Sequence, residues 1–91
     1  MLDWIRINDL DWIWLSKNPN AIDLLKDNIK KIDWDALSLN PNAIELLEKY
    51  PVRIDWKFLS ENPNAIDLLK INQKRINWNA LSANPAIFKV V

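Results

Sequence analysis

The chain has 91 residues, 49% of them hydrophobic, and its 12 basic and 12 acidic side chains balance to a formal net charge of zero. This is the composition of one folded domain, and the charge balance speaks against nucleic-acid binding, which draws most of its affinity from neutralised phosphates. Because the chain has no Cys, His or Gly, it lacks thiol ligands, the usual neutral-pH acid/base group and glycine-rich phosphate loops, so we expect no enzyme activity, cofactor or metal.

From residue 10 onward the sequence repeats every 22 residues. The consensus unit reads I-D-W-x-x-L-S-x-N-P-N-A-I-x-L-L, with Trp at positions 12, 34, 56 and 78, and its N-A-I and L-L parts are present in the first three units. A period of this length is typical of arrays in which neighbouring helical units stack on one another. We therefore expect one domain over residues 1–91, with a half-unit at 1–9, full units at 10–31, 32–53 and 54–75, and a truncated unit at 76–91.

The N-terminal half-unit places Leu2 in register with Leu24. Trp4 and Trp14 have no equivalents in later units, so we expect them to cover the open N-terminal face of the array. The first residues have neither a basic start nor a clean apolar stretch, and no run approaches the roughly 18 apolar residues of a membrane span. We therefore expect an intracellular, cytoplasmic protein without a signal peptide or a transmembrane segment.

Each unit carries the start and stop signals of two short helices. Asp33 is a good N-cap for a first helix, which must end by about Asn40 because the residue before a proline avoids the helical region. We expect Asn40 to cap the second helix, with Pro41 at its first position and Tyr50 near its end. Helices this short are unstable alone, so their stability must come from stacking. The fold class is therefore predicted as all-α, a short α-solenoid of tandem 22-residue helical hairpins.

The ends of the second helices differ between units. Asn28 and Asn72 stand where glycine often ends a helix, and we expect them to adopt the left-handed conformation. At the C-terminus, Phe88, Val90 and Val91 align with apolar positions of the second helix. With no unit after them, they form a candidate end-to-end contact.

The motif L-S-x-N-P-N-A-I-x-L-L followed by I-D-W resembles the short tandem repeats found in uncharacterised proteins of giant DNA viruses that infect amoebae and other protists. The resemblance spans residues 10–91, and the segment from Leu81 to Phe88 looks like the L-S-x-N-P-x-I-F variant that closes such arrays. It implies a viral helical-repeat protein, and it brings no catalytic or ligand-binding residues to transfer.

Three repeated residue types have both a ligand-binding and a structural interpretation. The Trp series can stack bases or ligands, but its spacing from the following Leu favours the core. The Asn series at 18, 40, 62 and 84 can read an extended ligand, but its lack of variation favours capping and hydrogen bonds between units. The Ser series at 16, 38, 60 and 82 has no His to activate it, which favours a structural role at a tight helix crossing.

Charged residues also recur as columns along the array. Asp23, Glu45 and Asp67 are expected to face solvent, and Asp11, Asp33 and Asp55 to cap helices, rather than to bind Ca²⁺ or work as acid and base. Lys31, Arg53 and Arg75 can attract an acidic partner or RNA. We favour an interaction with the C-terminal ends of helix dipoles.

Positions that change between units are the better guide to binding, because constant residues build a repeat fold. The candidate interaction surface consists of Ile13, Lys17, Asp35, Leu39, Lys57 and Glu61. Three functions follow: a non-enzymatic scaffold that binds an unknown protein partner, a structural unit that self-associates end to end, and a nucleic-acid binder, which zero net charge disfavours. We expect no membrane partner.

Overall fold

The computed structural model describes residues 4, 6 and 10–89, without the side chains of residues 88 and 89. Its α-helices are α1 (Trp12–Lys17), α2 (Ile22–Lys26), α3 (Trp34–Ser38), α4 (Ile44–Lys49), α5 (Trp56–Glu61), α6 (Ile66–Lys70) and α7 (Trp78–Leu81). Short 3₁₀ helices follow as η2 (Ile29–Lys31), η3 (Pro51–Arg53), η4 (Gln73–Arg75) and η5 (Pro85–Lys89). The described residues contain no strand, and the predicted all-α class is confirmed.

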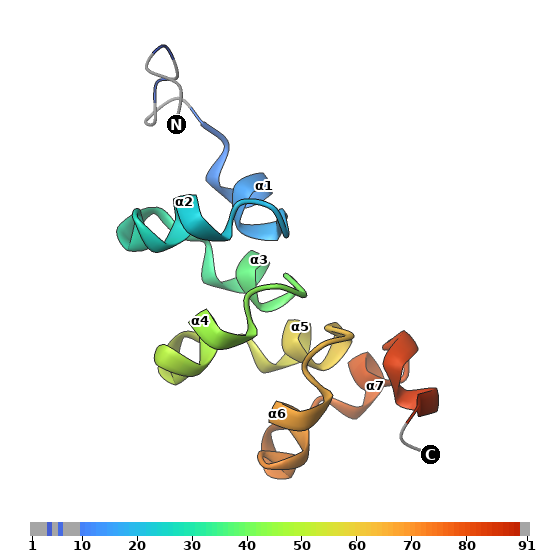
Figure 1. The fold of residues 1–91 in the computed structure, drawn as a ribbon. Helices are drawn as coiled ribbons and strands as arrows, with labels where there is room; N and C mark the ends of the chain where they lie inside the picture. Colours follow the sequence, from blue (N-terminus) through green and yellow to red (C-terminus); the bar gives the residue numbers. More distant parts are fainter. Residues whose placement is uncertain (1–3, 5, 7–9, 90–91) are drawn as a thin grey trace.

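The helices form two rows (Figure 1). Helices α1, α3, α5 and α7 lie side by side in one row, and each packs on the next. Helices α2, α4 and α6, each with its 3₁₀ turn, form the second row. The extents of 48 × 23 × 18 Å are those of an elongated stack, in which each unit contacts its immediate neighbours.

The first helix of each unit begins at the residue predicted from its cap. The carboxylate of Asp33 accepts a hydrogen bond from the backbone N–H of Ala36 at 3.0 Å, and Asp55 accepts from Phe58 at the same distance. Asn77 caps α7 through its side-chain oxygen in the same way. This capping is local chemistry that the sequence already encodes.

The predicted start of the second helix is wrong. Asn40 does not cap α4: its side-chain oxygen accepts from the N–H of Asn42 at 3.0 Å, which closes a turn ahead of the helix. Pro41 lies within that turn, and α4 begins at Ile44 with no side-chain cap. The Asn40 side chain thus accepts from the backbone N–H of the residue two positions later. This local bond competes with helix capping.

The second helix is shorter than predicted because it begins at Ile44 rather than Pro41; its end beside Tyr50 agrees with the prediction, and a separate 3₁₀ turn follows. Asn28 and Asn72 do not adopt the left-handed conformation: their φ angles are −135° and −129°. Instead, the side-chain amide of each donates to the carbonyl four residues earlier, Leu24 or Leu68, at 2.9 Å. This bond satisfies an orphan carbonyl at the helix end without a left-handed turn.

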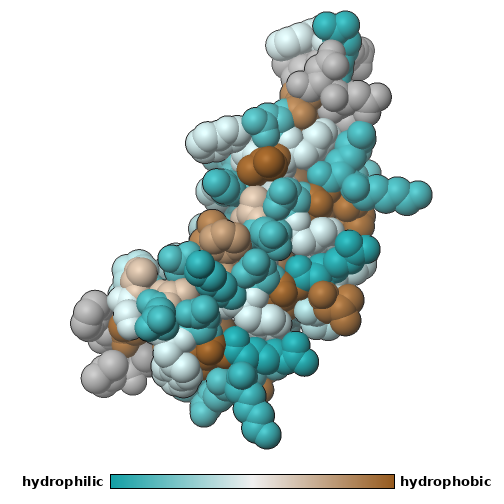
Figure 2. Space-filling model, turned by 180° about the vertical axis from the view of Figure 1, so that it is seen from behind, coloured by the Kyte–Doolittle hydropathy of each residue, from teal (hydrophilic) through white to brown (hydrophobic). Residues whose placement is uncertain are grey.

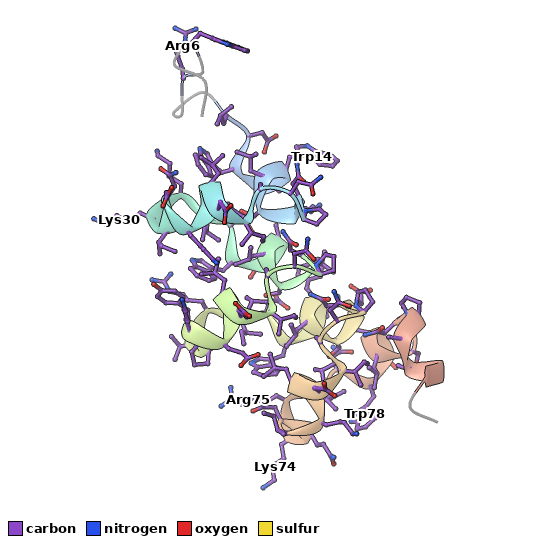
Figure 3. All side chains as sticks on the ribbon, viewed as in Figure 1. Arg6, Trp14, Lys30, Lys74, Arg75 and Trp78 are labelled. Carbon is purple, nitrogen blue, oxygen red and sulfur yellow. The ribbon has the colours of Figure 1, made fainter. Side chains whose placement is uncertain are left out.

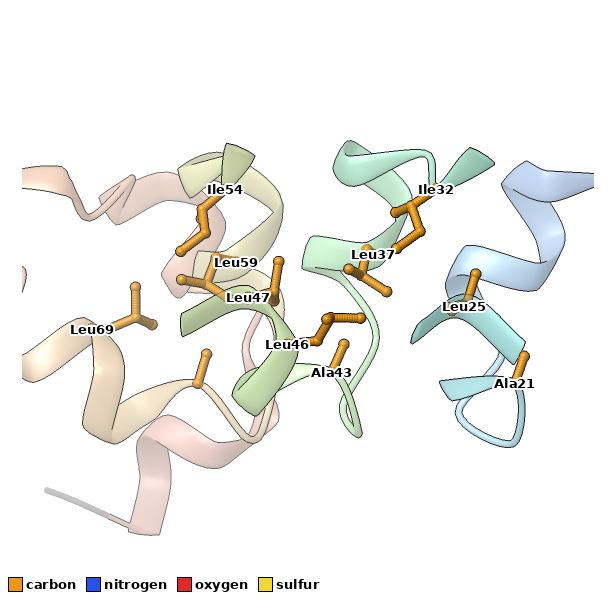
Figure 4. Close-up of a cluster of buried hydrophobic side chains, with 11 residues drawn as sticks. Ala21, Leu25, Ile32, Leu37, Ala43, Leu46, Leu47, Ile54, Leu59 and Leu69 are labelled. Carbon is orange, nitrogen blue, oxygen red and sulfur yellow. The ribbon is translucent and has the colours of Figure 1, made fainter. Parts of the chain in front are cut away.

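The core runs between the two rows (Figure 4). Its largest buried side chains are one or two leucines from each of the first three units: Leu25, Leu37, Leu47, Leu59 and Leu69. Ala43 and Ala65 are fully buried at the start of the second helices. Each buried Leu contributes about 1.5–3 kcal/mol before the entropy of ordering the chain is subtracted.

Candidate interaction surfaces

The repeated serines join each unit to the next. The hydroxyl of Ser38 donates to the carbonyl of Trp34 at 2.9 Å and accepts from the backbone N–H of Asp55 at 3.0 Å. Ser16 and Ser60 make the same pair of bonds and are equally buried. The predicted structural role of these serines is confirmed.

The repeated asparagines form a second connection between units. The side-chain amide of Asn62 donates to the carbonyls of Ser38 and Asn40 at 3.0 and 2.9 Å, and Asn40 and Asn84 repeat this pattern. The second Asn of the motif adds a bond, since Asn64 donates to the carbonyl of Pro41 at 2.8 Å. These amides are occupied within the fold, so the predicted hydrogen bonding between units is confirmed.

The tryptophans are only partly core residues. Trp12, Trp34 and Trp56 are half-buried against the core, as predicted, but Trp78 is 64% exposed and the prediction is wrong there. In the described part of the chain, α7 is followed by the 3₁₀ helix η5 and not by an α-helix like those that follow Trp12, Trp34 and Trp56.

Basic side chains of the 3₁₀ turns lie over two of these rings. The Lys31 amine is 5.9 Å from the ring centre of Trp12, and the Arg75 guanidinium is 5.5 Å from that of Trp56. Trp34 instead contacts Tyr50, with the ring centres 5.2 Å apart. The basic column that we expected at helix dipoles therefore also makes cation–π contacts, and these contacts occupy ring faces that base stacking would need.

The two N-terminal tryptophans do not cover the end of the array. Trp4 is 77% and Trp14 is 69% exposed, so this prediction is wrong. Lys17 of the same helix lies over the Trp14 ring at 5.4 Å. Leu2 and most of the predicted half-unit lie outside the described residues.

The variable positions fall on the first row of helices. We call these six residues the strip: Ile13 and Lys17 on α1, Asp35 and Leu39 on or at the end of α3, and Lys57 and Glu61 on α5. Within each helix the two residues are four apart and share a face, and the pairs recur along the packed row. Ile13, Lys17, Asp35 and Lys57 are exposed, while Leu39 and Glu61 are half-buried.

One strip residue has an unusual electrostatic environment. The pKa of Asp35 is raised above its usual value, first by partial desolvation and then by the negative charges of Asp55 and Asp33 and a hydrogen bond with Asp55. Asp35 therefore lies against the N-cap of the next unit, a contact that the sequence analysis missed. The described residues contain no group of three acidic side chains placed to hold a metal ion.

The C-terminal end of the array contains an apolar hollow of about 440 Å³. Its lining includes Ile66 and Leu69 of α6, Trp78 and Leu81 of α7, and Ile87 of η5. The predicted end contact at Phe88, Val90 and Val91 lies outside the described side chains. Among the described residues, this hollow is therefore the apolar surface that the C-terminal end offers.

These features define an all-α protein of tandem helical units that are joined by a regular ladder of hydrogen bonds. Comparisons with protein-family models, with curated proteins and with solved structures give no match to the chain. Among the described residues, no helix is both long enough and apolar enough to cross a membrane.

Proposed function

We propose that the chain is a non-enzymatic scaffold that binds a protein partner through the strip. The observation that carries this proposal is a division of roles between the repeated positions and the variable positions of the unit. The repeated Ser, Asn and Asp side chains are used in bonds within and between units, whereas the strip positions vary and lie along the solvent-facing side of the first row. Such a division is typical of repeat scaffolds, whose constant residues build the fold and whose variable residues meet partners.

The chemistry of the strip favours a protein over a nucleic acid. Along the row, positive and negative charges alternate at Lys17, Asp35, Lys57 and Glu61, and the apolar side chains of Ile13 and Leu39 lie among them. A phosphate backbone needs a continuous positive surface, whereas mixed charge around apolar contacts suits a protein surface. On the face drawn in Figure 2, hydrophobic side chains appear as separate spots among hydrophilic ones rather than as one continuous patch.

Because the repeat resembles those of giant-virus proteins, we propose to search for the partner in infected protist cells. The test is a capture experiment from a nuclease-treated lysate of infected amoebae. Three forms of the 91-residue chain are compared: the unmodified chain, a strip variant with Lys17→Glu, Asp35→Lys and Lys57→Glu, and a control with Val52→Ser and Ile71→Ser, which changes exposed apolar residues off the strip. Far-UV circular dichroism first establishes that all three are folded.

The proposal expects a polypeptide that the unmodified chain and the control both retain and the strip variant loses. It is abandoned if every retained polypeptide binds the strip variant equally well. If the unmodified chain retains polypeptides from an untreated lysate but none from the nuclease-treated lysate, the result favours the nucleic-acid alternative instead.

A further inference from the structure

We propose that the chain associates head to tail with a second copy of itself, with α1 of one copy packed on α7 of the other. The two ends of the array carry opposite halves of the junction that joins neighbouring units. The contact uses end-facing residues rather than the strip, so the two proposals can fail independently.

The hydrogen bonds between units all run in one direction. At each junction the later unit donates and the earlier unit accepts: Asn40 donates to Ser16 and Asn18, and Asp55 donates to Ser38. Among the described residues, the first unit therefore has donors without such an acceptor, and the last unit has acceptors without such a donor. The end of one chain is complementary to the beginning of another, which is not the case for two like ends.

The unused donors lie on the first unit. The side-chain amide of Asn18 makes no hydrogen bond to the described residues, although its equivalents Asn40, Asn62 and Asn84 each make two. Among the described residues, the one side-chain bond at Asn18 is the bond that its oxygen accepts from the N–H of Asn20 at 2.9 Å. The side-chain amide of the exposed Asn18 is therefore without a described acceptor, whereas the equivalent amides of the later units donate to backbone carbonyls.

The first unit also exposes an apolar group at a position that is buried or half-buried in the other units. Trp14 stands at the position of Ala36, Phe58 and Ala80. Ala80 is 7% exposed although no described unit follows α7, so the preceding unit must cover this position. No described unit precedes Trp14, which is 69% exposed and projects from α1 (Figure 3). Phe58 is half-buried at the same position, so a junction of this kind accommodates an aromatic ring.

The last unit presents the matching surface. Ser16 is fully buried although it belongs to the first described unit, so the following unit must cover the serine position. Its equivalent Ser82 is exposed, and the hydroxyl only donates to Trp78 at 3.0 Å, with no described N–H reaching it. Leu81 is half-buried where Leu37 and Leu59 are fully buried. Beside these residues lies the apolar hollow of about 440 Å³.

Placing a second copy in the register of an internal junction satisfies both ends. The amide of Asn18 then donates to the carbonyls of Ser82 and Asn84 in the other copy, and the N–H of Asp11 donates to the Ser82 hydroxyl. Trp14 becomes buried against α7, which removes a large apolar side chain from water. Because this contact joins unlike surfaces, it repeats without closing, and stacks lengthen as concentration rises.

The experiment blocks the ends one at a time. Three variants carry the same change in charge: Trp14→Glu at the N-terminal end, Ser82→Glu at the C-terminal end, and Val52→Glu as a control on the exposed middle turn. All three sites are exposed, and circular dichroism verifies folding. Sedimentation velocity and small-angle scattering are measured over a hundredfold range of concentration.

The unmodified chain and Val52→Glu are expected to show a mass and a maximum dimension that rise together with concentration. Trp14→Glu and Ser82→Glu are each expected to stay monomeric alone. Mixed, they are expected to form a one-to-one dimer, because each still has one working end of the opposite kind. An unmodified chain that stays monomeric throughout, or a single-end variant that still dimerises alone, overturns the proposal.

Discussion

Asn62→Ala tests the hydrogen bonds that join neighbouring units, at an Asn side chain that is fully buried. The Asn62 side chain is fully buried and makes three bonds: two donated to the carbonyls of Ser38 and Asn40, and one accepted from the N–H of Asn64. The substitution leaves the Ser38 carbonyl without its partner from the next unit, while Asn40 keeps the bond from Ala43 at 3.1 Å. A buried polar group without a partner costs about 1–3 kcal/mol, and each lost bond about 1 kcal/mol. We therefore expect Asn62→Ala to lower the free energy of unfolding by about 3–4 kcal/mol.

That loss is a large share of the total, since a domain of this length has a free energy of unfolding of about 5–14 kcal/mol. The matched control is Asn18→Ala, the same change at the same motif position. Asn18 is exposed and its side chain only accepts from Asn20, so we expect a loss of about 0.5–1 kcal/mol. Both are measured by urea unfolding at low micromolar concentration, with tryptophan fluorescence and far-UV circular dichroism as probes. Equal losses in the two variants would refute the assignment of stability to the bonds between units.

Three further predictions concern the same junctions. Ser38→Ala is expected to lower the unfolding free energy by about 1–3 kcal/mol, because the Asp55 N–H loses its acceptor, whereas Ser82→Ala costs less than about 0.5 kcal/mol; similar shifts in urea midpoint contradict this. Leu59→Ala is expected to cost about 2–5 kcal/mol and the half-buried Leu81→Ala clearly less, and thermal melts that rank them the other way count against the described core. Asp35→Asn is expected to stabilise the fold at neutral pH, because a raised pKa in the folded state means that the charged carboxylate is disfavoured there. The gain should disappear as the pH falls below the usual Asp value of 3.8, and a gain that is independent of pH is evidence against the contact with Asp55.

Local chemistry was predictable from the sequence, and contacts across units were predictable only in part. Asp33 caps its helix through a residue three positions away, so the signal and the contact lie in one short segment. Asn40 carries the same kind of local signal, since an Asn before Pro fits both a helix cap and a turn. Its role is decided by carbonyls 22 and 24 residues earlier, which a local motif does not reveal.

Exposure at the ends was the least predictable property. Trp56 and Trp78 occupy the same motif position, but one is half-buried and the other is largely exposed. Their own sequence context is nearly identical, so the difference comes from the elements packed beside them. Likewise, the proximity of Asp35 to Asp55 depends on how one unit is set against the next, not on the residues around either one.

The acceptors of the Asn ladder are backbone carbonyls, and this has a consequence for how such a chain can change in length. A backbone carbonyl is present whatever side chain a position carries, so each unit offers the same hydrogen-bond acceptors to the next unit. Duplicating a whole unit reproduces one complete junction and disturbs none of the existing ones. Inserting a single residue between Asn40 and Ser60 changes the spacing between the Asn62 amide and its acceptors at Ser38 and Asn40, whereas the later junction of Asn84 with Ser60 and Asn62 keeps its spacing. A change in length by whole 22-residue units therefore preserves the spacing of every junction, whereas an insertion within a unit alters the junction that spans it.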